Sequence, residues 1–193
     1  MALYGIGDLH LSLGAEKPMD IFGGLWKDHQ EKLREAFSPL GPEDVCVILG
    51  DLSWSMGLEN AAADFRFLDE LGGRKLLLKG NHDYWWSTGA KVRRFFEQEE
   101  IRSVRILHNN CYTYGDLAIC GTRGWLKVPA EMQKMYLVSL LCKPQRWPRA
   151  HIQHAFVAVH IHYYPSSIYA VLEFLRCVQL QIRGGKPELA AVA

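Results

Sequence analysis

Long apolar runs, closely paired cysteines and an excess of charge of one sign are all missing from this sequence. No apolar run approaches the roughly 20 residues that a membrane helix needs, so we expect no membrane-spanning segment. The first residues carry neither a basic region nor a long apolar region, so we expect no signal peptide. The 22 basic and 21 acidic residues leave a net charge of +1, which gives no general attraction to nucleic acid or to anionic membranes.

Cysteine usage points to a reducing compartment. The five cysteines are odd in number, widely spaced and contain no CxxC pair. They are Cys46, Cys111, Cys120, Cys142 and Cys177. This pattern argues against a disulfide framework and against a zinc–cysteine site, and it favours a cytoplasmic location.

The order of apolar runs predicts an α/β layered fold. Apolar runs at residues 3–7, 45–49 and 75–78 are typical of buried strands, and apolar residues at helical spacing follow each of them. The predicted helices lie around residues 26–37, 58–71 and 92–96. From residue 104 on, short runs separated by Asn109-Asn110 and Gly115-Asp116 predict hairpins. With 193 residues, we expect one domain over residues 1–193, a mixed β-sheet sandwich flanked by helices.

The last third of the chain has a weaker pattern. We expect helices at residues 131–141 and 167–178, a strand at residues 155–162, and a frayed tail from residue 184. No internal repeat and no low-complexity segment occurs.

Polar residues of metal-binding type follow each of the first three predicted strands. Asp8 and His10 stand at i and i+2, which places them on the same side of an extended segment. Asp51 follows a glycine that allows the sharp turn needed to point the carboxylate inward. Asn81 and His82 follow another glycine, in the same position relative to their strand. Because ligands collect beyond the carboxyl ends of strands in open α/β sheets, we expect these side chains to converge on one crevice.

Each of these motifs has an ordinary explanation when it occurs alone. An isolated Asp-x-His is more often a surface pair, an isolated Gly-Asp is usually a turn, and an isolated Asn-His-Asp is usually a helix cap or a polar loop. Their joint occurrence in this order, each at the end of an apolar strand, favours a functional site.

The three motifs together resemble those of the calcineurin-like metallophosphoesterase family. That family's pattern runs Asp-x-His, Gly-Asp, Gly-Asn-His-Asp/Glu, a later His, and a final Gly-His-x-His. The chain supplies Gly7-Asp8-Leu9-His10, Gly50-Asp51 and Gly80-Asn81-His82-Asp83. Tryptophans beside these motifs and in Gly121-Thr122-Arg123-Gly124-Trp125 resemble those of the family's bacterial cytosolic phosphohydrolases. The resemblance is good over residues 1–125 and poor over residues 126–193.

The resemblance implies a two-metal hydrolase. Two divalent ions (manganese, iron or zinc) would activate a bridging hydroxide that attacks a phosphomonoester or a phosphodiester. The ligands would be Asp8, His10 and Asp51 for one ion, and Asp51, Asn81 and His162 for the other. The partner would be a small phosphorylated substrate, and nucleic acid would bind only as a phosphodiester substrate.

Three further residues are candidates for acting on the substrate. His82 would stabilise the transferring phosphoryl group or protonate the leaving oxygen. Asp83 would hold that imidazole in the useful tautomer or only cap the following helix, and both interpretations stay open. Arg123 either reaches a substrate phosphate or is a surface arginine in a tight turn.

The four tryptophans near the motifs line a rim or pack in the core, and we expect core packing for at least two. They are Trp54, Trp85, Trp86 and Trp125.

The closing Gly-His-x-His of the family pattern is missing, and no histidine follows His162. His160 lies two residues earlier on the same strand face, and we interpret it as an ordinary histidine rather than a ligand. A competing hypothesis is therefore a catalytically weak or inactive metal-binding relative, incomplete at the C-terminus, in which each ion keeps three protein ligands.

Overall fold

The computed structural model describes residues 2–115, 117–123, 154–160, 179–183 and 186–190. Contacts divide the chain into two compact units, Met1–Ile106 and Leu107–Ala193, which are described separately below. The expectation of a single domain over residues 1–193 stays a prediction. No helix in the described ranges is both long enough and apolar enough to cross a bilayer.

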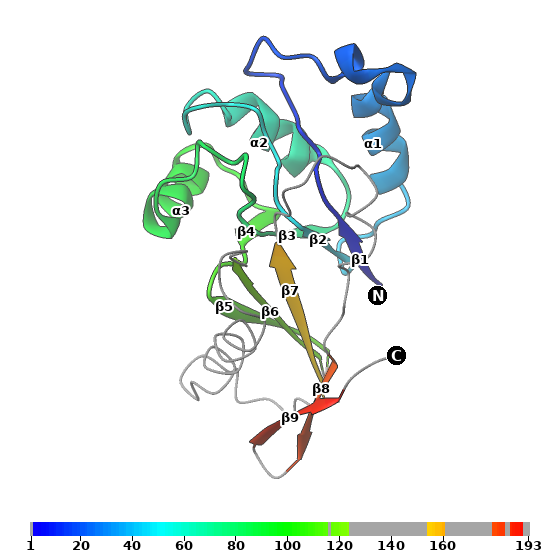
Figure 1. Cartoon of the computed structure of the whole chain (residues 1–193), viewed down its shortest axis with the longest axis vertical. Coiled ribbons are helices and arrows are strands. Elements are labelled where there is room, and N and C mark those ends of the chain that lie inside the picture. Colours follow the sequence, from blue (N-terminus) through cyan, green and yellow to red (C-terminus); the bar gives the residue numbers. More distant parts are fainter. Residues whose placement is uncertain (1, 116, 124–153, 161–178, 184–185, 191–193) are drawn as a thin grey trace. The chain divides into compact units, whose positions relative to one another are not determined.

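The first unit contains a four-stranded parallel sheet (Figure 1). Its strands are β1 (Leu3–Ile6), β2 (Val45–Ile48), β3 (Arg74–Leu77) and β4 (Val104–Ile106), in that order across the sheet. Every residue of β2 is buried, as expected for a strand that is covered on both faces. Because all four strands run the same way, their carboxyl ends meet at one edge.

Three helices accompany this sheet: α1 (His29–Phe37), α2 (Ala62–Glu70) and α3 (Gly89–Gln98). Two short 3-10 helices, η1 (Met19–Phe22) and η2 (Gly24–Trp26), precede α1. The helix predicted from residue 26 begins at His29 instead, because Asp28 has a left-handed backbone (φ 55°) that interrupts the helical path.

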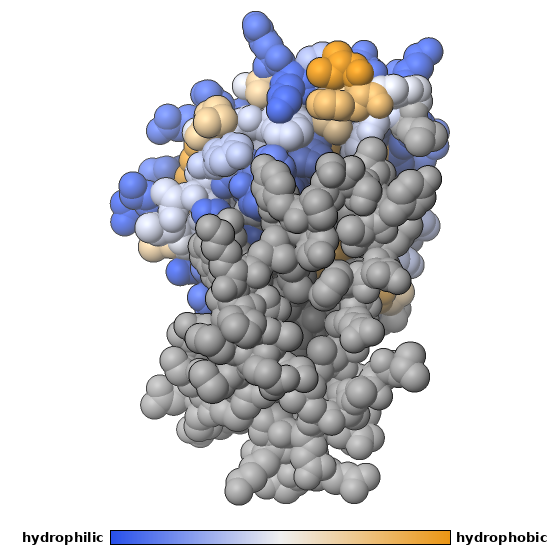
Figure 2. Space-filling model, viewed as in Figure 1, coloured by the Kyte–Doolittle hydropathy of each residue, from blue (hydrophilic) through white to orange (hydrophobic). Residues whose placement is uncertain are grey.

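Aromatic side chains fill the core between α2 and α3. Phe65 is fully buried, and its ring lies 4.9 Å from that of Phe96 and 5.0 Å from that of Trp85. Trp85 and Trp86 are only 2% and 4% exposed, so the prediction that at least two tryptophans pack in the core is confirmed. On the face seen in Figure 2, the coloured residues are mostly hydrophilic, with a small hydrophobic patch at the top of the view.

The second unit contains a mixed five-stranded sheet. Its strands are β5 (Asn110–Tyr114), β6 (Leu117–Arg123), β7 (His154–His160), β8 (Gln179–Arg183) and β9 (Lys186–Ala190). β6 and β7 run parallel, and the other neighbours run antiparallel. The hairpin predicted at Gly115 is confirmed, with that glycine in a left-handed conformation (φ 60°) between β5 and β6.

Three expectations for the later chain were wrong. The turn at Asn109-Asn110 does not join a hairpin, because Ile106 belongs to the parallel sheet of the first unit. The tail was expected to fray, but β9 pairs with β8 along its whole length. Cys111 and Cys120 face each other across β5 and β6 and form a disulfide, which cysteine spacing alone did not predict. The helices expected at residues 131–141 and 167–178 lie outside the described residues.

Candidate metal site

Asp8, His10 and Asp51 come together at the carboxyl ends of β1 and β2. Each offers one donor atom, and the three atoms all lie within 4.8 Å of one another. His10 Nε2 is 3.6 Å from Asp8 Oδ1. The predicted convergence of these three side chains is therefore confirmed.

The backbone that brings these donors together differs from the extended segment that the i, i+2 spacing suggested. β1 ends at Ile6, and both Asp8 (φ 55°) and His10 (φ 45°) have left-handed backbones, as does Asp51 (φ 52°). Backbone hydrogen bonds from Asp8 N to Gly50 O (3.1 Å) and from His10 N to Asp51 O (3.0 Å) hold the two loops together. Left-handed backbone is costly for residues with a side chain, and such strain collects at functional sites.

The donor set fits a divalent cation of the manganese, iron or zinc type. Two carboxylates and one imidazole are hard or borderline ligands, with no thiolate among them. Asp51 is 2% exposed and His10 8% exposed, whereas the Asp8 side chain is half exposed. His10 Nδ1 is buried and has no hydrogen-bond partner among the residues that the structure describes, and a further ligand would be favourable at a buried polar atom left in this way.

The loop after β3 packs directly against Asp51. His82 N donates a hydrogen bond to Asp51 Oδ1 (2.8 Å). A methyl group on Gly80 would overlap both the carboxylate and the amide nitrogen of Asp51. Asn81 lies between these two contacts along the chain, so its backbone shares the loop that touches Asp51. Its role as a ligand of a second ion stays a prediction.

The His82 ring lies beside the cluster. Its centroid is 5.8 Å from that of His10 and 5.1 Å from that of Trp54. This position is compatible with the predicted action of His82 on a substrate next to the metal, which stays a prediction.

Asp83 has neither of the two roles that its sequence position suggested. Its buried carboxylate accepts hydrogen bonds from four backbone amides and one indole N–H. The donors are Asp51 N (2.9 Å), Leu52 N (2.8 Å), Ser53 N (3.5 Å), Gly80 N (2.7 Å) and Trp85 Nε1 (3.0 Å). The His82 ring is not among them.

The helix cap that was considered for Asp83 is supplied by Thr88, whose Oγ1 accepts from Lys91 N (3.3 Å) at the start of α3. Burial raises the pKa of Asp83, and the amide donors of Gly80 and Leu52 oppose that rise. The Asp83 carboxylate therefore binds the backbone of the loops after β2 and β3 and does not cap α3.

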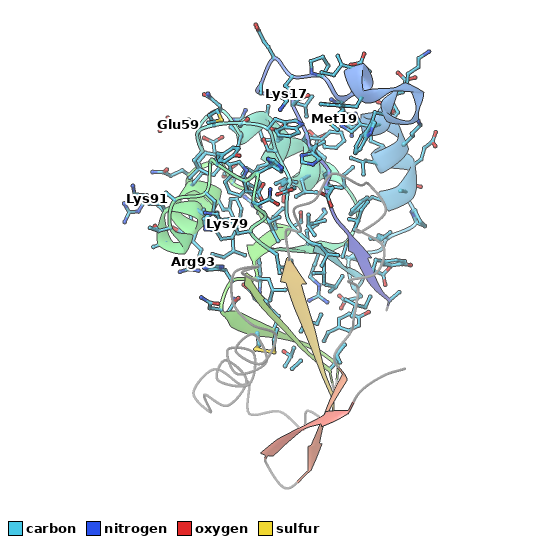
Figure 3. The ribbon with its side chains drawn as sticks, in the orientation of Figure 1. Lys17, Met19, Glu59, Lys79, Lys91 and Arg93 are labelled. Carbon is cyan, nitrogen blue, oxygen red and sulfur yellow. A yellow bond between two sulfur atoms is a disulfide. The ribbon has the colours of Figure 1, made fainter. Side chains whose placement is uncertain are left out.

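Trp54 forms a wall of the site, a role that the sequence left open. Its ring stacks on the His10 ring with 4.4 Å between centroids and 14° between planes. Lys17 Nζ lies 3.2 Å from the Trp54 ring centroid, and Trp54 Nε1 donates to Met19 Sδ (3.0 Å). Lys17 and Met19, labelled in Figure 3, belong to the segment between β1 and α1. The tryptophan three residues after Asp51 was the available signal.

Trp26 and His29 add two more rings to this aromatic cluster. The sequence did not single out His29. The Trp26 ring lies 6.5 Å from that of His10 and 5.9 Å from that of His29. Burial lowers the pKa of His29, although Asp20 opposes the change. His29 carried no motif signal because its only sequence context is the start of a helix.

The predicted site residues of the second unit are only partly described. Arg123 ends β6 and is paired along the backbone with His160, the last residue of β7. Their side chains and His162 lie outside what is described, so their roles stay predictions.

Comparison with known proteins gives a family assignment. A family model for the calcineurin-like phosphoesterases matches residues 1–175. Among solved structures, the protein of unknown function AQ665 from Aquifex aeolicus is similar, with 18% sequence identity and a TM-score of 0.42; the match covers 82% of this chain and 90% of that one. No curated protein matches significantly.

Proposed function

Because this chain belongs to the calcineurin-like phosphoesterase family, we propose that it is a hydrolase that cleaves a phosphomonoester or phosphodiester with the help of two divalent ions, manganese, iron or zinc. The cluster of Asp8, His10 and Asp51 is the observation that carries this proposal. The substrate in the proposal is a small phosphorylated molecule. The proposal also includes a cytoplasmic location, which rests on the wide spacing of the cysteines. The Cys111–Cys120 disulfide is an observation against that location.

The residues of the site have distinct tasks in this proposal. When bound, the ions supply positive charge for the phosphoryl oxygens and lower the pKa of the attacking water. Asp8, His10 and Asp51 hold the first ion, with Asp51 also facing the loop that carries Asn81. Trp54 covers one face of the His10 ring and excludes water from it. His82, 5.8 Å from His10 by ring centroids, protonates the leaving oxygen or stabilises the phosphoryl group.

A metal-binding relative with little or no turnover is the second candidate. The observation that favours it is the lack of any histidine after His162 in the sequence, where the family pattern has Gly-His-x-His. Fewer ligands for each ion would weaken metal binding and with it the activation of water.

Elemental analysis combined with an aryl phosphate assay tests the proposal. In buffer that contains Mn²⁺, the wild-type chain is expected to bind the metal and to hydrolyse the aryl phosphate, and Asp51→Ala is expected to lose both. Glu100→Ala is the matched control, because Glu100 also has a left-handed backbone (φ 56°) but lies between α3 and β4, outside the cluster. Metal without turnover in the wild type would favour the second candidate, and absence of metal would overturn both.

A further inference from the structure

Two buried carboxylates lie behind the metal ligands without belonging to them. We propose that Asp64 and Asp83 are positioning residues, which hold the loops after β1, β2 and β3 in the metal-binding arrangement before any metal arrives. The inference rests on the proposed function for the binding of a metal, but the hydrogen bonds that carry it are present in the metal-free chain.

Asp83 joins the loop after β2 to the loop after β3. On one side it accepts from the amides of Asp51 and Leu52, and on the other from the amide of Gly80 (2.7 Å). The side chain is 1% exposed, so water does not compete for these hydrogen bonds. Because one carboxylate collects donors from both loops, it fixes the distance between Asp51 and the Gly80–His82 segment that packs on it.

Asp64, on α2, joins the loop after β1 to the loop after β2. Its Oδ1 accepts from Leu13 N (2.8 Å), and its Oδ2 accepts from Ser53 Oγ (2.5 Å) and Ser55 Oγ (3.5 Å). The amide of Gly14 is a further donor. Asp64 is 0% exposed, so water does not compete for these hydrogen bonds either.

Ser53 connects the two carboxylates. Its hydroxyl donates to Asp64, and its amide donates to Asp83 at the longer distance of 3.5 Å. Neither carboxylate forms an ion pair with a lysine or arginine in the described part of the chain. Their charge is balanced by N–H and O–H groups of the loops, which satisfy them in one loop geometry only.

This bracing offsets the strain of the ligand positions. Asp8, His10 and Asp51 all have left-handed backbones, which free loops would leave readily. The carboxylate group is essential to the bracing, because an isosteric amide replaces one acceptor oxygen by an N–H₂ group that faces N–H donors. Asp83→Asn and Asp64→Asn should therefore keep the shape of the side chain and lose the bracing.

Amide hydrogen exchange in the metal-free chain, followed by Mn²⁺ titration, tests the inference. Asp83→Asn should make exchange at Leu52 and Gly80 about 10-fold faster or more, and Asp64→Asn should do so at Leu13. The dissociation constant for Mn²⁺ should rise about 10-fold or more in both variants.

Asp69→Asn is the matched control, since Asp69 accepts from Arg102 N (3.0 Å) and Ser103 N (2.7 Å) and ties α2 to the segment before β4. It should lower the unfolding midpoint and leave Mn²⁺ affinity and exchange at Leu52 unchanged. If Asp83→Asn and Asp64→Asn behave like this control, the two aspartates are only structural and the inference is overturned.

A milder variant keeps the inference testable if the aspartate variants do not fold. Ser53→Ala removes the hydroxyl link to Asp64 but retains both carboxylates, and it should give a smaller rise in the Mn²⁺ dissociation constant. An unchanged constant together with unchanged exchange at Leu13 would overturn the inference. If the wild-type chain binds no Mn²⁺, the proposed function is wrong. Amide exchange at Leu13, Leu52 and Gly80 would then still test whether Asp64 and Asp83 hold the loops in place.

Discussion

At the residue scale, the contact between Gly80 and Asp51 sets the tightest constraint on the site. Any side chain at position 80 would occupy the volume of the Asp51 carboxylate and of its backbone nitrogen. The neighbouring amide of His82 donates to the same carboxylate at 2.8 Å. The glycine of the Gly-Asn-His-Asp motif is therefore required for close approach and not for an unusual backbone angle.

Gly80→Ala should displace the Asp51 carboxylate and weaken Mn²⁺ binding about 10-fold or more, as loss of a supporting contact commonly does. Gly57→Ala is the control, because a methyl group there would meet nothing within 4 Å. Isothermal titration of both variants checks the difference. Equal Mn²⁺ affinity in the two variants would contradict the tight packing at Gly80.

Asp51 and His82 should separate metal binding from turnover. Asp51→Asn should reduce both the metal content and the activity, because Asp51 supplies a donor atom of the cluster. His82→Asn should lower activity but retain the metal, since its ring stands beside the cluster. Elemental analysis and aryl phosphate turnover of each variant check this. Equal loss of metal in the two variants would mean that His82 is a ligand.

The residues of the candidate metal site could be identified from the sequence, but their geometry could not. Asp8, His10 and Asp51 were predicted from their positions after apolar runs, and they do converge. The left-handed backbone at all three could not be predicted, because Asp and His adopt it more often than most residues but still do so at only a small minority of their positions. The two buried aspartates illustrate the same limit, because Asp64 in α2 looks like any polar residue on an amphipathic helix.

At the element scale, β3 carries an unusual residue for a buried strand. Lys75 is 0% exposed, and its Nζ donates to the Leu71 carbonyl and to Ser103 Oγ (3.0 Å). It lies directly opposite Cys46 of β2. Burial lowers the pKa of Lys75 from 10.5 to about 8, and Asp69 only partly opposes that shift.

The lowered pKa of Lys75 should make the free energy of unfolding depend on pH. Between pH values of about 8 and 10.5 the folded chain holds a neutral Lys75 while the unfolded chain holds a charged one, so the free energy of unfolding should rise with pH in that window. Lys75→Met should remove this rise. Urea unfolding of both chains at about pH 7 and about pH 10 measures it.

The Cys46 thiol acts in the opposite direction, because burial raises its pKa to about 12. It is present in both chains, so its contribution largely cancels in the comparison. A difference in unfolding free energy that does not change with pH would contradict the burial of an uncharged Lys75.

Element positions followed from the apolar pattern more reliably than element partners did. The three predicted strands of the first unit end within a residue or so of β1, β2 and β3, because a run of buried apolar residues in a parallel sheet is distinctive. β4 has only three residues, Val104–Ile106, and so short a strand does not reveal whether it pairs in parallel or in a hairpin. The Cys111–Cys120 pair likewise depends on a register that cysteine spacing does not encode.

At the scale of the whole molecule, the three candidate metal donors that the structure brings together all come from the first unit. Asp8, His10 and Asp51 lie within Met1–Ile106, whereas Arg123, His160 and His162 belong to Leu107–Ala193. The family pattern takes its last ligands from late in the chain, where this sequence has no Gly-His-x-His. Whether the whole molecule supplies enough ligands for two ions is therefore a question for experiment.

We predict that the chain binds Mn²⁺ weakly, and that replacing the residues after His162 with a segment carrying Gly-His-x-His lowers the dissociation constant about 10-fold or more. The reason is that the added imidazoles would take ligand positions that water otherwise fills. Mn²⁺ titration of the original chain and of the chain with the replaced segment checks this. Stoichiometric retention of two ions by the original chain after dialysis, with brisk turnover, would contradict the prediction and indicate that another residue such as His160 supplies the ligand.

The left-handed backbone at Asp8, His10 and Asp51 also bears on how this protein would respond to selection in the laboratory. Glycine adopts that conformation without the cost of roughly 1 kcal/mol or more that other residues bear, and it would remove two like charges from one crevice. A library screened for heat resistance alone should therefore accumulate glycine at these three positions. The survivors would keep the sheet and its aromatic core and would no longer hold a metal, so directed evolution for stability would erase the site before it damaged the fold.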